Sequence, residues 1–198
     1  MSEFTPTRSV VLELKDEHRA MHEGYVFLDE KCLLLAGEML RELERYSELQ
    51  QAFLKAWDAA VAALQAAVAR NGLEGLQVYA PADLGAAHVR RVPRSLMGVR
   101  LQHAELVADA LPVPLGVDRS PEAEVCRRAF GYVLAQAAPL AAVAGNLERL
   151  QLEYRRAVRR ARALQDVLLP ELDRIVYDIE TRLEELEQED AIWMRQGK

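Results

Sequence analysis

Apolar residues recur at every third or fourth position along the first third of the chain. The series begins at Leu14, ends at Ala67 and is broken only by His18 and Glu42. A mean spacing of about 3.5 residues, sustained over this many turns, is typical of the seam between two paired helices. We therefore expect one long helix here, with the apolar series facing a partner helix.

A second apolar series lies near the C-terminus. It runs from Leu147 to Leu168, and after Pro170 it resumes from Leu172 to Leu186. Leu172 follows Leu168 by four residues, where three would have kept the phase. We expect the supercoil to relax locally at this point.

The two series predict an all-α fold built on a long antiparallel two-helix coiled coil, formed by the N- and C-terminal helices. Of the 198 residues, 1–70 are assigned to an N-terminal coiled-coil helix, 71–120 to a middle head segment and 121–198 to a C-terminal coiled-coil helix region, together one structural unit. Pro and Gly are concentrated in the middle, so the head is expected to be small and mixed, with short helices and a β-hairpin.

Capping and breaking residues predict where these elements begin and end. The first helix should begin near Thr5 or Thr7, whose hydroxyls accept from orphan amides, and stop at Asn71-Gly72, which tolerate the left-handed conformation. The second helical region should open at Ser120 with a cap, a first-turn proline and an early acid. In the head, residues 76–79 and 88–92 are predicted to pair as strands, and residues 95–110 to include a short helix.

Two glycines and two prolines lie inside the predicted helices. Gly24 and Gly37 each cost a helix about 1 kcal/mol relative to Ala, which leaves two explanations, close approach of another surface or a tolerated cost. Pro139 and Pro170 each remove a backbone hydrogen bond and are expected to bend the helix.

Composition narrows the class of protein. Hydrophobic residues make up 51% of the chain but aromatic residues only 6%, which suits Ala- and Leu-rich seams better than a large sheet or a deep ligand pocket. The net charge of −6 argues against a general nucleic-acid binder. Cys32 and Cys126 form no CxxC pair, so a reducing cytosol is the expected compartment.

Membrane insertion is not expected. The first residues show no signal-peptide pattern. The uncharged stretch between Arg128 and Glu148 is long enough for a span, but it is rich in Ala and contains Pro and Gly. We interpret it as a buried helix of a soluble protein.

Motifs for catalysis and metal binding are missing from the sequence. His18 and His22 share a helix face, but no HExxH or Glu-x-x-His motif supplies further ligands. The sequence also lacks a phosphate-binding loop and a Gly-x-Ser-x-Gly motif. We therefore expect no catalytic, cofactor-binding or metal-binding residues.

Two charged clusters lie in the C-terminal region. The basic cluster is a solvated face beside the seam or a docking patch for acidic partner loops, and its members are Arg155, Arg156, Arg159, Arg160 and Arg162. Nucleic-acid binding is a weaker third interpretation, because no aromatic residues interleave with the arginines. Acidic residues gather between Glu180 and Asp190, where a helix dipole disfavours them. The antiparallel helix carries residues that would offset these acids, namely Arg8, Lys15, Arg19 and Lys31.

Three sequence blocks, in order and covering nearly the whole chain, resemble the D subunit of the V-type (vacuolar and archaeal) rotary ATPases. They are residues 6–8, 11–15, 24–25 and 28–31 at the N-terminus, residues 94–99 with Met97-Gly98-Val99 in the middle, and residues 159–164, 167–170, 183–185 and 187–189 at the C-terminus. The chain departs from the family pattern at Cys32, Leu33, Arg162, Gln165 and Gln188.

The resemblance implies a central-stalk rotor subunit with no catalytic activity of its own. Its rotation would couple ATP hydrolysis or synthesis in a catalytic head to proton or sodium transport. The implied partners are the A and B subunits of the head, the F subunit of the stalk and the ring-capping subunit of the membrane sector. The implied location is cytoplasmic and peripheral to the membrane, with no nucleic acid, no cofactor, no direct membrane insertion and no homodimer.

Candidate partner-interface residues come from the ends of the helices, the Met-Gly-Val block and the basic cluster. They are Thr7, Arg8, Lys15, Met97, Gly98, Val99, Arg155, Arg159, Arg160, Glu187, Met194 and Arg195. Two other classes of protein stay open at this point, a coiled-coil adaptor that tethers two partners and a helical enzyme. A stable homodimer in sedimentation would favour the adaptor.

Overall fold

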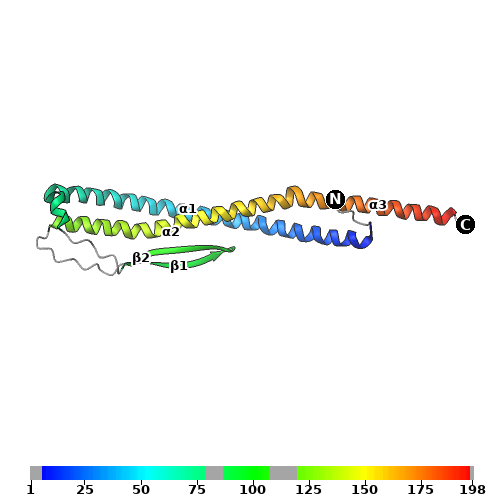
Figure 1. Cartoon of the computed structure of the whole chain (residues 1–198), viewed down its shortest axis with the longest axis horizontal. Helices are drawn as coiled ribbons and strands as arrows, with labels where there is room; N and C mark the ends of the chain where they lie inside the picture. Colours follow the sequence, from blue (N-terminus) through cyan, green and yellow to red (C-terminus); the bar gives the residue numbers. More distant parts are fainter. Residues whose placement is uncertain (1–5, 79–86, 108–119, 197–198) are drawn as a thin grey trace. The chain divides into compact units, whose positions relative to one another are not determined.

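The computed structural model describes residues 6–78, 87–107 and 120–196. Within these ranges, three α-helices, one π-helical segment and one hairpin follow in the order α1 (Arg8–Gln77), β1 (His88–Leu96), β2 (Val99–Val107), α2 (Pro121–Ala163), η1 (Leu164–Leu168) and α3 (Leu169–Gln196). The predicted fold class is confirmed, because long helices pair antiparallel and a small antiparallel hairpin lies between them in the chain (Figure 1).

The chain divides into two compact units. The terminal unit comprises Met1–Leu34 and Glu153–Lys198, and the central unit comprises Leu35–Leu152. Each unit contains a stretch of α1 paired with a later helical segment, and the hairpin belongs to the central unit.

The terminal unit has a core of large aliphatic side chains. Val11 and Leu14 of α1 pack with Leu172 and Ile179 of α3, and all four are at most 8% exposed. Burying one such side chain contributes about 1.5–3 kcal/mol. The two ends of the chain are therefore joined by an apolar seam, as the two sequence series predict.

The central unit has a thinner seam. Ala56 and Ala60 of α1 lie against Val133 of α2, and Phe53 and Phe130 border this cluster. Small side chains let two helix axes approach closely, so this pairing explains the Ala-rich part of the N-terminal series. Residues of the N-terminal series are buried or partly buried throughout, including Glu42, which the sequence pattern treated as an interruption.

The hairpin differs from the one predicted. β1 pairs with β2 in a register that places Leu96 opposite Val99, so Met97 and Gly98 alone form the turn. Both turn residues have positive φ, 48° and 84°, as a tight two-residue hairpin requires. The predicted strand at 76–79 is wrong because Leu76 and Gln77 are helical, and the predicted helix within 95–110 is wrong because β2 occupies residues 99–107.

The predicted break at Asn71-Gly72 is present, although the helix resumes beyond it. Gly72 has φ 66° and ψ 167°, and helical structure then continues to Gln77. The Asn71 amide donates to Ala67 O at 3.0 Å and to Ser120 Oγ at 2.9 Å. Ser120 in turn accepts from the Ala123 amide at the start of α2, which confirms the predicted cap.

A π-helical turn precedes Pro170. The Leu169 N–H donates to Leu164 O, five residues back, and none of residues 164–168 is buried. A π-turn accommodates one more residue than an α-turn. It therefore takes up the extra residue between Leu168 and Leu172 that broke the phase of the sequence series, whereas α2 runs without interruption through Pro139.

Of the two explanations for the helical glycines, the structure favours a tolerated loss of helix stability over close approach of another surface. A methyl group on Gly24 would lie 3.9 Å from Leu164 Cδ1, an ordinary contact, and one on Gly37 would meet nothing within 4 Å. Neither position therefore requires glycine for close approach.

Replacing Gly37 with Ala is expected to raise the free energy of unfolding by about 1 kcal/mol, because Ala restricts the unfolded chain and favours the helix. A thermal melt of the full chain measures this as a higher midpoint. Gly98→Ala is the matched control, and it should lower the midpoint because φ at Gly98 is 84°. A lower midpoint for Gly37→Ala would contradict the open space at this site.

Length and composition alone would allow α1 and the helical stretch Pro121–Arg195 to cross a membrane. The packed helices of soluble proteins pass the same test. In this chain part of each stretch pairs with another helix, and 17% and 22% of the two apolar windows are buried.

Candidate functional site

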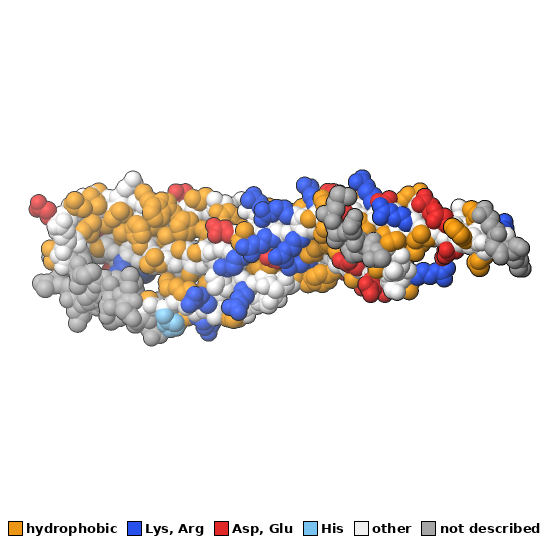
Figure 2. All heavy atoms as spheres, turned by 45° about the vertical axis from the view of Figure 1, so that its right-hand side comes forward, with side chains coloured by type: hydrophobic (Ala, Val, Ile, Leu, Met, Phe, Trp, Pro, Cys, Tyr) orange, Lys and Arg blue, Asp and Glu red, His pale blue; other side chains and the backbone are white. Residues whose placement is uncertain are grey.

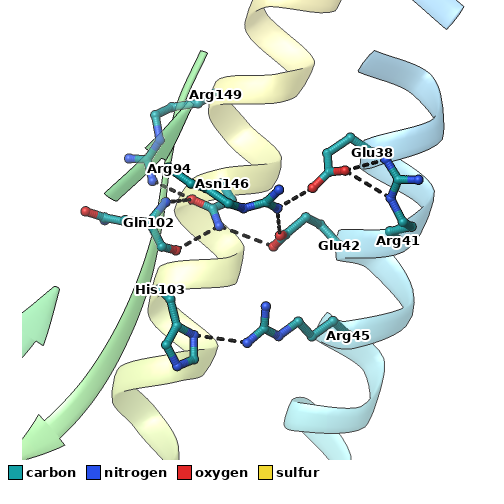
Figure 3. A network of polar contacts seen from close by, with 9 residues as sticks. All are labelled: Glu38, Arg41, Glu42, Arg45, Arg94, Gln102, His103, Asn146 and Arg149. Atoms are coloured by element: carbon teal, nitrogen blue, oxygen red, sulfur yellow. Dashed lines mark hydrogen bonds and ion pairs between the residues drawn. The ribbon is translucent and has the colours of Figure 1, made fainter. Parts of the chain in front are cut away.

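A buried pair of carboxylates on α1 forms the base of a polar network in the central unit. Glu38 and Glu42 are four residues apart and therefore share one helix face. They are only 4% and 3% exposed. Buried carboxylates need charged or hydrogen-bonding partners, and in this unit the partners come from the hairpin, from α2 and from α1 itself (Figure 3).

Arg94 of β1 binds both carboxylates. Its Nη2 lies 2.7 Å from Glu42 Oε1 and also forms an ion pair with Glu38. Arg41, one turn along α1, donates to Glu38 Oε2 from Nε at 3.0 Å and from Nη2 at 2.6 Å. The hairpin is thus held to α1 by one arginine that two carboxylates share.

These contacts set the ionisation of Glu38. Burial alone would raise the pKa of its carboxyl, but the hydrogen bonds from Arg94 and Arg41 outweigh burial and hold the pKa below its ordinary value. A carboxyl whose pKa is lowered on folding stabilises the folded protein at pH values above the ordinary pKa of that carboxyl. That stability is lost as the pH falls through the lowered value.

Asn146 of α2 holds the other strand of the hairpin. Its Oδ1 accepts from the Gln102 backbone N–H at 2.9 Å, and its Nδ2 donates to the Gln102 carbonyl at 2.9 Å and to Glu42 Oε2 at 3.3 Å. The side-chain amide thus binds the backbone of β2 as a neighbouring strand would. Arg149 Nη2 donates to Asn146 Oδ1 at 2.9 Å, which fixes the orientation of the amide.

This arrangement also explains the proline in β1. The outward N–H and C=O of Gln102 bind Asn146, so Gln102 and Pro93, its cross-strand partner, form one of the pairs that exchange no ladder hydrogen bonds. Pro93 therefore removes no ladder bond, consistent with the confinement of proline to such positions.

A further contact lies at the exposed edge of the network. Arg45 Nη2 of α1 is 3.0 Å from His103 Nδ1 of β2. Because a guanidinium carries only donors, His103 Nδ1 is the acceptor in this contact. The network is suited to holding the hairpin against two helices, and it contains no nucleophile paired with a base.

In the terminal unit, ion pairs join α1 to the C-terminal helical segments. Arg8 lies 2.6 Å from Glu187 and Lys15 lies 2.6 Å from Glu180. Two of the four basic residues that were expected to offset the acidic cluster therefore form ion pairs with it. Arg19 instead pairs with Asp16 on its own helix. These contacts are solvent-exposed, so water and salt screen them and they add little to the stability of the helix pair.

Lys31 forms the most enclosed of these pairs. Its Nζ lies 2.6 Å from Glu153 Oε1, and the two side chains are 14% and 24% exposed. The hydrogen bond from Lys31 holds the pKa of the Glu153 carboxyl below its ordinary value, although burial opposes this, and Arg156 and Arg160 lower it further by their charge.

The two histidines considered as metal ligands have other neighbours. His18 Nε2 lies 3.2 Å from Asp173 Oδ1, and the His18 and His22 rings stack with centroids 6.5 Å apart. Within residues 6–78, 87–107 and 120–196, no three His, Cys, Asp or Glu side chains are grouped so that they could hold a metal ion.

The structure places the predicted partner-interface residues in both units. The terminal unit holds Thr7, Arg8, Lys15, Arg155, Arg159, Arg160, Glu187, Met194 and Arg195. Of these, Thr7 accepts from the Val10 amide at the start of α1, and Arg8 and Glu187 pair with each other.

The Met-Gly-Val block lies in the central unit. Met97 and Gly98 form the hairpin turn, and Val99 is buried at 6% exposure. The predicted interface residues at the end of α3 are exposed instead: Met194 is 74% exposed, and Arg195 is also exposed.

Sequence reasoning missed the residues that hold the hairpin. Two signals were available: a glutamate in an otherwise apolar series at Glu42, and an asparagine in an Ala-rich helix at Asn146. Neither signal says where the partner lies, since Arg94 and Gln102 are more than forty residues away in the chain.

Comparison with known proteins assigns this arrangement to a family. The family model for the D subunit of ATP synthase matches residues 10–196, which include both units and the hairpin. The chain belongs to the ATP synthase D-subunit family. The resemblance found in the sequence is thereby confirmed.

Curated relatives support the D-subunit assignment over nearly their full length. The V-type ATP synthase D subunit of Thermotoga neapolitana is 25% identical over 98% of this chain and 96% of its own. The A-type ATP synthase D subunits of Methanopyrus kandleri and Pyrococcus furiosus are each 27% identical, over 100% and 98% of this chain and 87% and 92% of their own. As a member of this family, the chain is one component of a V/A-type ATPase complex.

Proposed function

We propose that this D subunit is the rotor shaft of a V/A-type ATP synthase. It carries torque between the ATP-handling head and the ion-translocating membrane sector, and it has no catalytic centre of its own. Its proposed partners are the A and B subunits of the head, the F subunit of the stalk and the ring-capping subunit, on the cytoplasmic side of the membrane.

The observation that supports this proposal most directly is the pairing of the two ends of the chain. Val11 and Leu14 pack against Leu172 and Ile179, and ion pairs such as Lys15–Glu180 lie on the same helix pair. Two helices joined along a seam resist twisting better than one helix, because relative rotation would pull apart a packed core.

The test is direct observation of rotation. Arg91 is exposed on β1, so Arg91→Cys, in a chain whose Cys32 and Cys126 are replaced by Ser, provides a single attachment point for a bead. In complexes whose head is fixed to a surface, ATP should drive unidirectional turning of the bead. A stationary bead on complexes that hydrolyse ATP would overturn the rotor proposal, and ATP hydrolysis by the purified chain would overturn its non-catalytic part.

A further inference from the structure

The terminal unit carries a concentrated positive charge on the side of α2 that faces away from the seam. We call this the basic face, and its members are Arg155, Arg156, Arg159, Arg160 and Arg162. All five are exposed, whereas Ala157 and Ala161 between them are only 2% and 8% exposed. Figure 2 shows Lys and Arg side chains gathering in groups on the surface of the molecule.

The basic face is largely uncompensated. Of its five members, Arg156 lies within ion-pair distance of a carboxylate, 3.9 Å from Glu153, whose other oxygen is bound by Lys31 at 2.6 Å. Within the described part of the chain, Arg155, Arg159, Arg160 and Arg162 form no ion pair; Arg159 donates instead to the Arg155 carbonyl.

Apart from the charge that Arg156 and Arg160 bring near Glu153, the isolated chain gains little from this arrangement. Arg155 and Arg159 are four residues apart, as are Arg156 and Arg160, and like charges at that spacing destabilise a helix. The chain has a net charge of −6, so carboxylates are plentiful, yet most of these arginines are not paired with one. Like charges placed together without such pairing indicate that the arginines interact with another molecule.

We propose that the basic face is a docking surface for a short acidic segment of a partner protein. Carboxylates match the arginine fork bidentately, and the face spans about two helical turns, on the order of 10 Å, which suits a short segment. A membrane or a nucleic acid is an extended polyanion, which the net negative charge of the chain would repel. That the partner is an ATP synthase subunit rests on the proposed function. That the docking segment is acidic rests only on the arginines of the basic face.

The test compares two variants of the full chain with equal loss of charge. The first replaces Arg155, Arg159, Arg160 and Arg162 with Gln and so breaks no ion pair. The control replaces with Gln four exposed arginines that have no ion pair in the described ranges, namely Arg91, Arg128, Arg174 and Arg182. The probes are a labelled Glu-rich peptide, vesicles of phosphatidylglycerol, and ATP synthase complex stripped of this subunit.

At about 50 mM KCl the first variant should bind the peptide and the stripped complex about tenfold more weakly than wild type, with a shallower salt dependence, whereas the control stays within about twofold. Equal weakening in both variants, or none, overturns the proposal. Preferential binding of wild type to the vesicles over the peptide overturns it in favour of a membrane surface. If wild type binds the peptide but not the stripped complex, the docking surface is supported and only the proposed rotor function is contradicted.

Discussion

Asn146→Leu is expected to release the hairpin of the central unit. Asn146 is 2% exposed and provides both hydrogen bonds to the Gln102 backbone. Leu has a similar volume but no polar atoms, so the Gln102 N–H and C=O would remain without partners. Each unsatisfied buried group costs about 1–3 kcal/mol, and we expect a loss of about 3 kcal/mol from the free energy of hairpin opening.

Native-state hydrogen exchange of residues 88–107 measures this loss, as an acceleration of about a hundredfold in the ladder amides. The matched control is Gln102→Ala, which removes the side chain but keeps the backbone groups that Asn146 binds. It should change exchange by less than about threefold. Equal acceleration in both variants would show that the side chain of Gln102, not its backbone, holds the strand.

Arg94→Met is expected to have the second largest effect. Without the guanidinium, Glu42 loses its ion pair and Glu38 keeps only Arg41. Removing one partner of a buried pair is strongly destabilising, but Arg94 is 49% exposed at its side chain, so water can reach part of the site. We expect a loss of about 2 kcal/mol at neutral pH, measured by hydrogen exchange of the hairpin.

The pH dependence distinguishes this charge effect from lost packing. In wild type the pKa of Glu38 lies below 4.5, its ordinary value, so its ion pairs add stability at neutral pH and lose it in acid. In Arg94→Met only Arg41 still opposes burial, so the pKa of Glu38 lies higher than in wild type and less stability is lost as the pH falls. The difference between the proteins should therefore shrink toward acid. A constant difference would attribute the effect to packing, and Arg91→Met, at an exposed arginine of the same strand, should change little.

The spacing of apolar residues predicted the helix pairing because one requirement recurs along the whole helix: every third or fourth residue must face the partner helix. The residues from Leu14 to Ala67 face a partner helix whatever the rest of the chain does, and the structure buries this series at least in part throughout. The pairing of the chain ends could be predicted for the same reason, since the large aliphatic residues lie near both termini.

The hairpin was misplaced because local preferences point elsewhere. β2 contains Leu, Gln, Ala and Glu, which favour helices in isolation, and strand pairing with β1 overrides that preference. The turn is equally hidden, since two-residue hairpin turns favour Asn-Gly or Asp-Gly and Met97 occupies a left-handed conformation that is uncommon for its type.

The polar network could not be predicted because its logic is tertiary. A glutamate within an apolar series indicates only that a partner is needed. That Arg94 and Asn146 meet Glu42 depends on the register of the hairpin against both helices, which no local pattern encodes.

The π-turn at Leu164–Leu168 has a consequence for chain length. An added residue in a regular helix rotates everything beyond it by about 100°, which would turn Leu172 and Ile179 away from α1. Because the π-turn absorbs one residue, a chain shortened by a single residue within this turn would keep both flanking seams in place and gain an unbroken heptad phase. Relatives that differ by one residue in length are therefore expected to show the gap in an alignment at this turn, and not elsewhere along the paired helices.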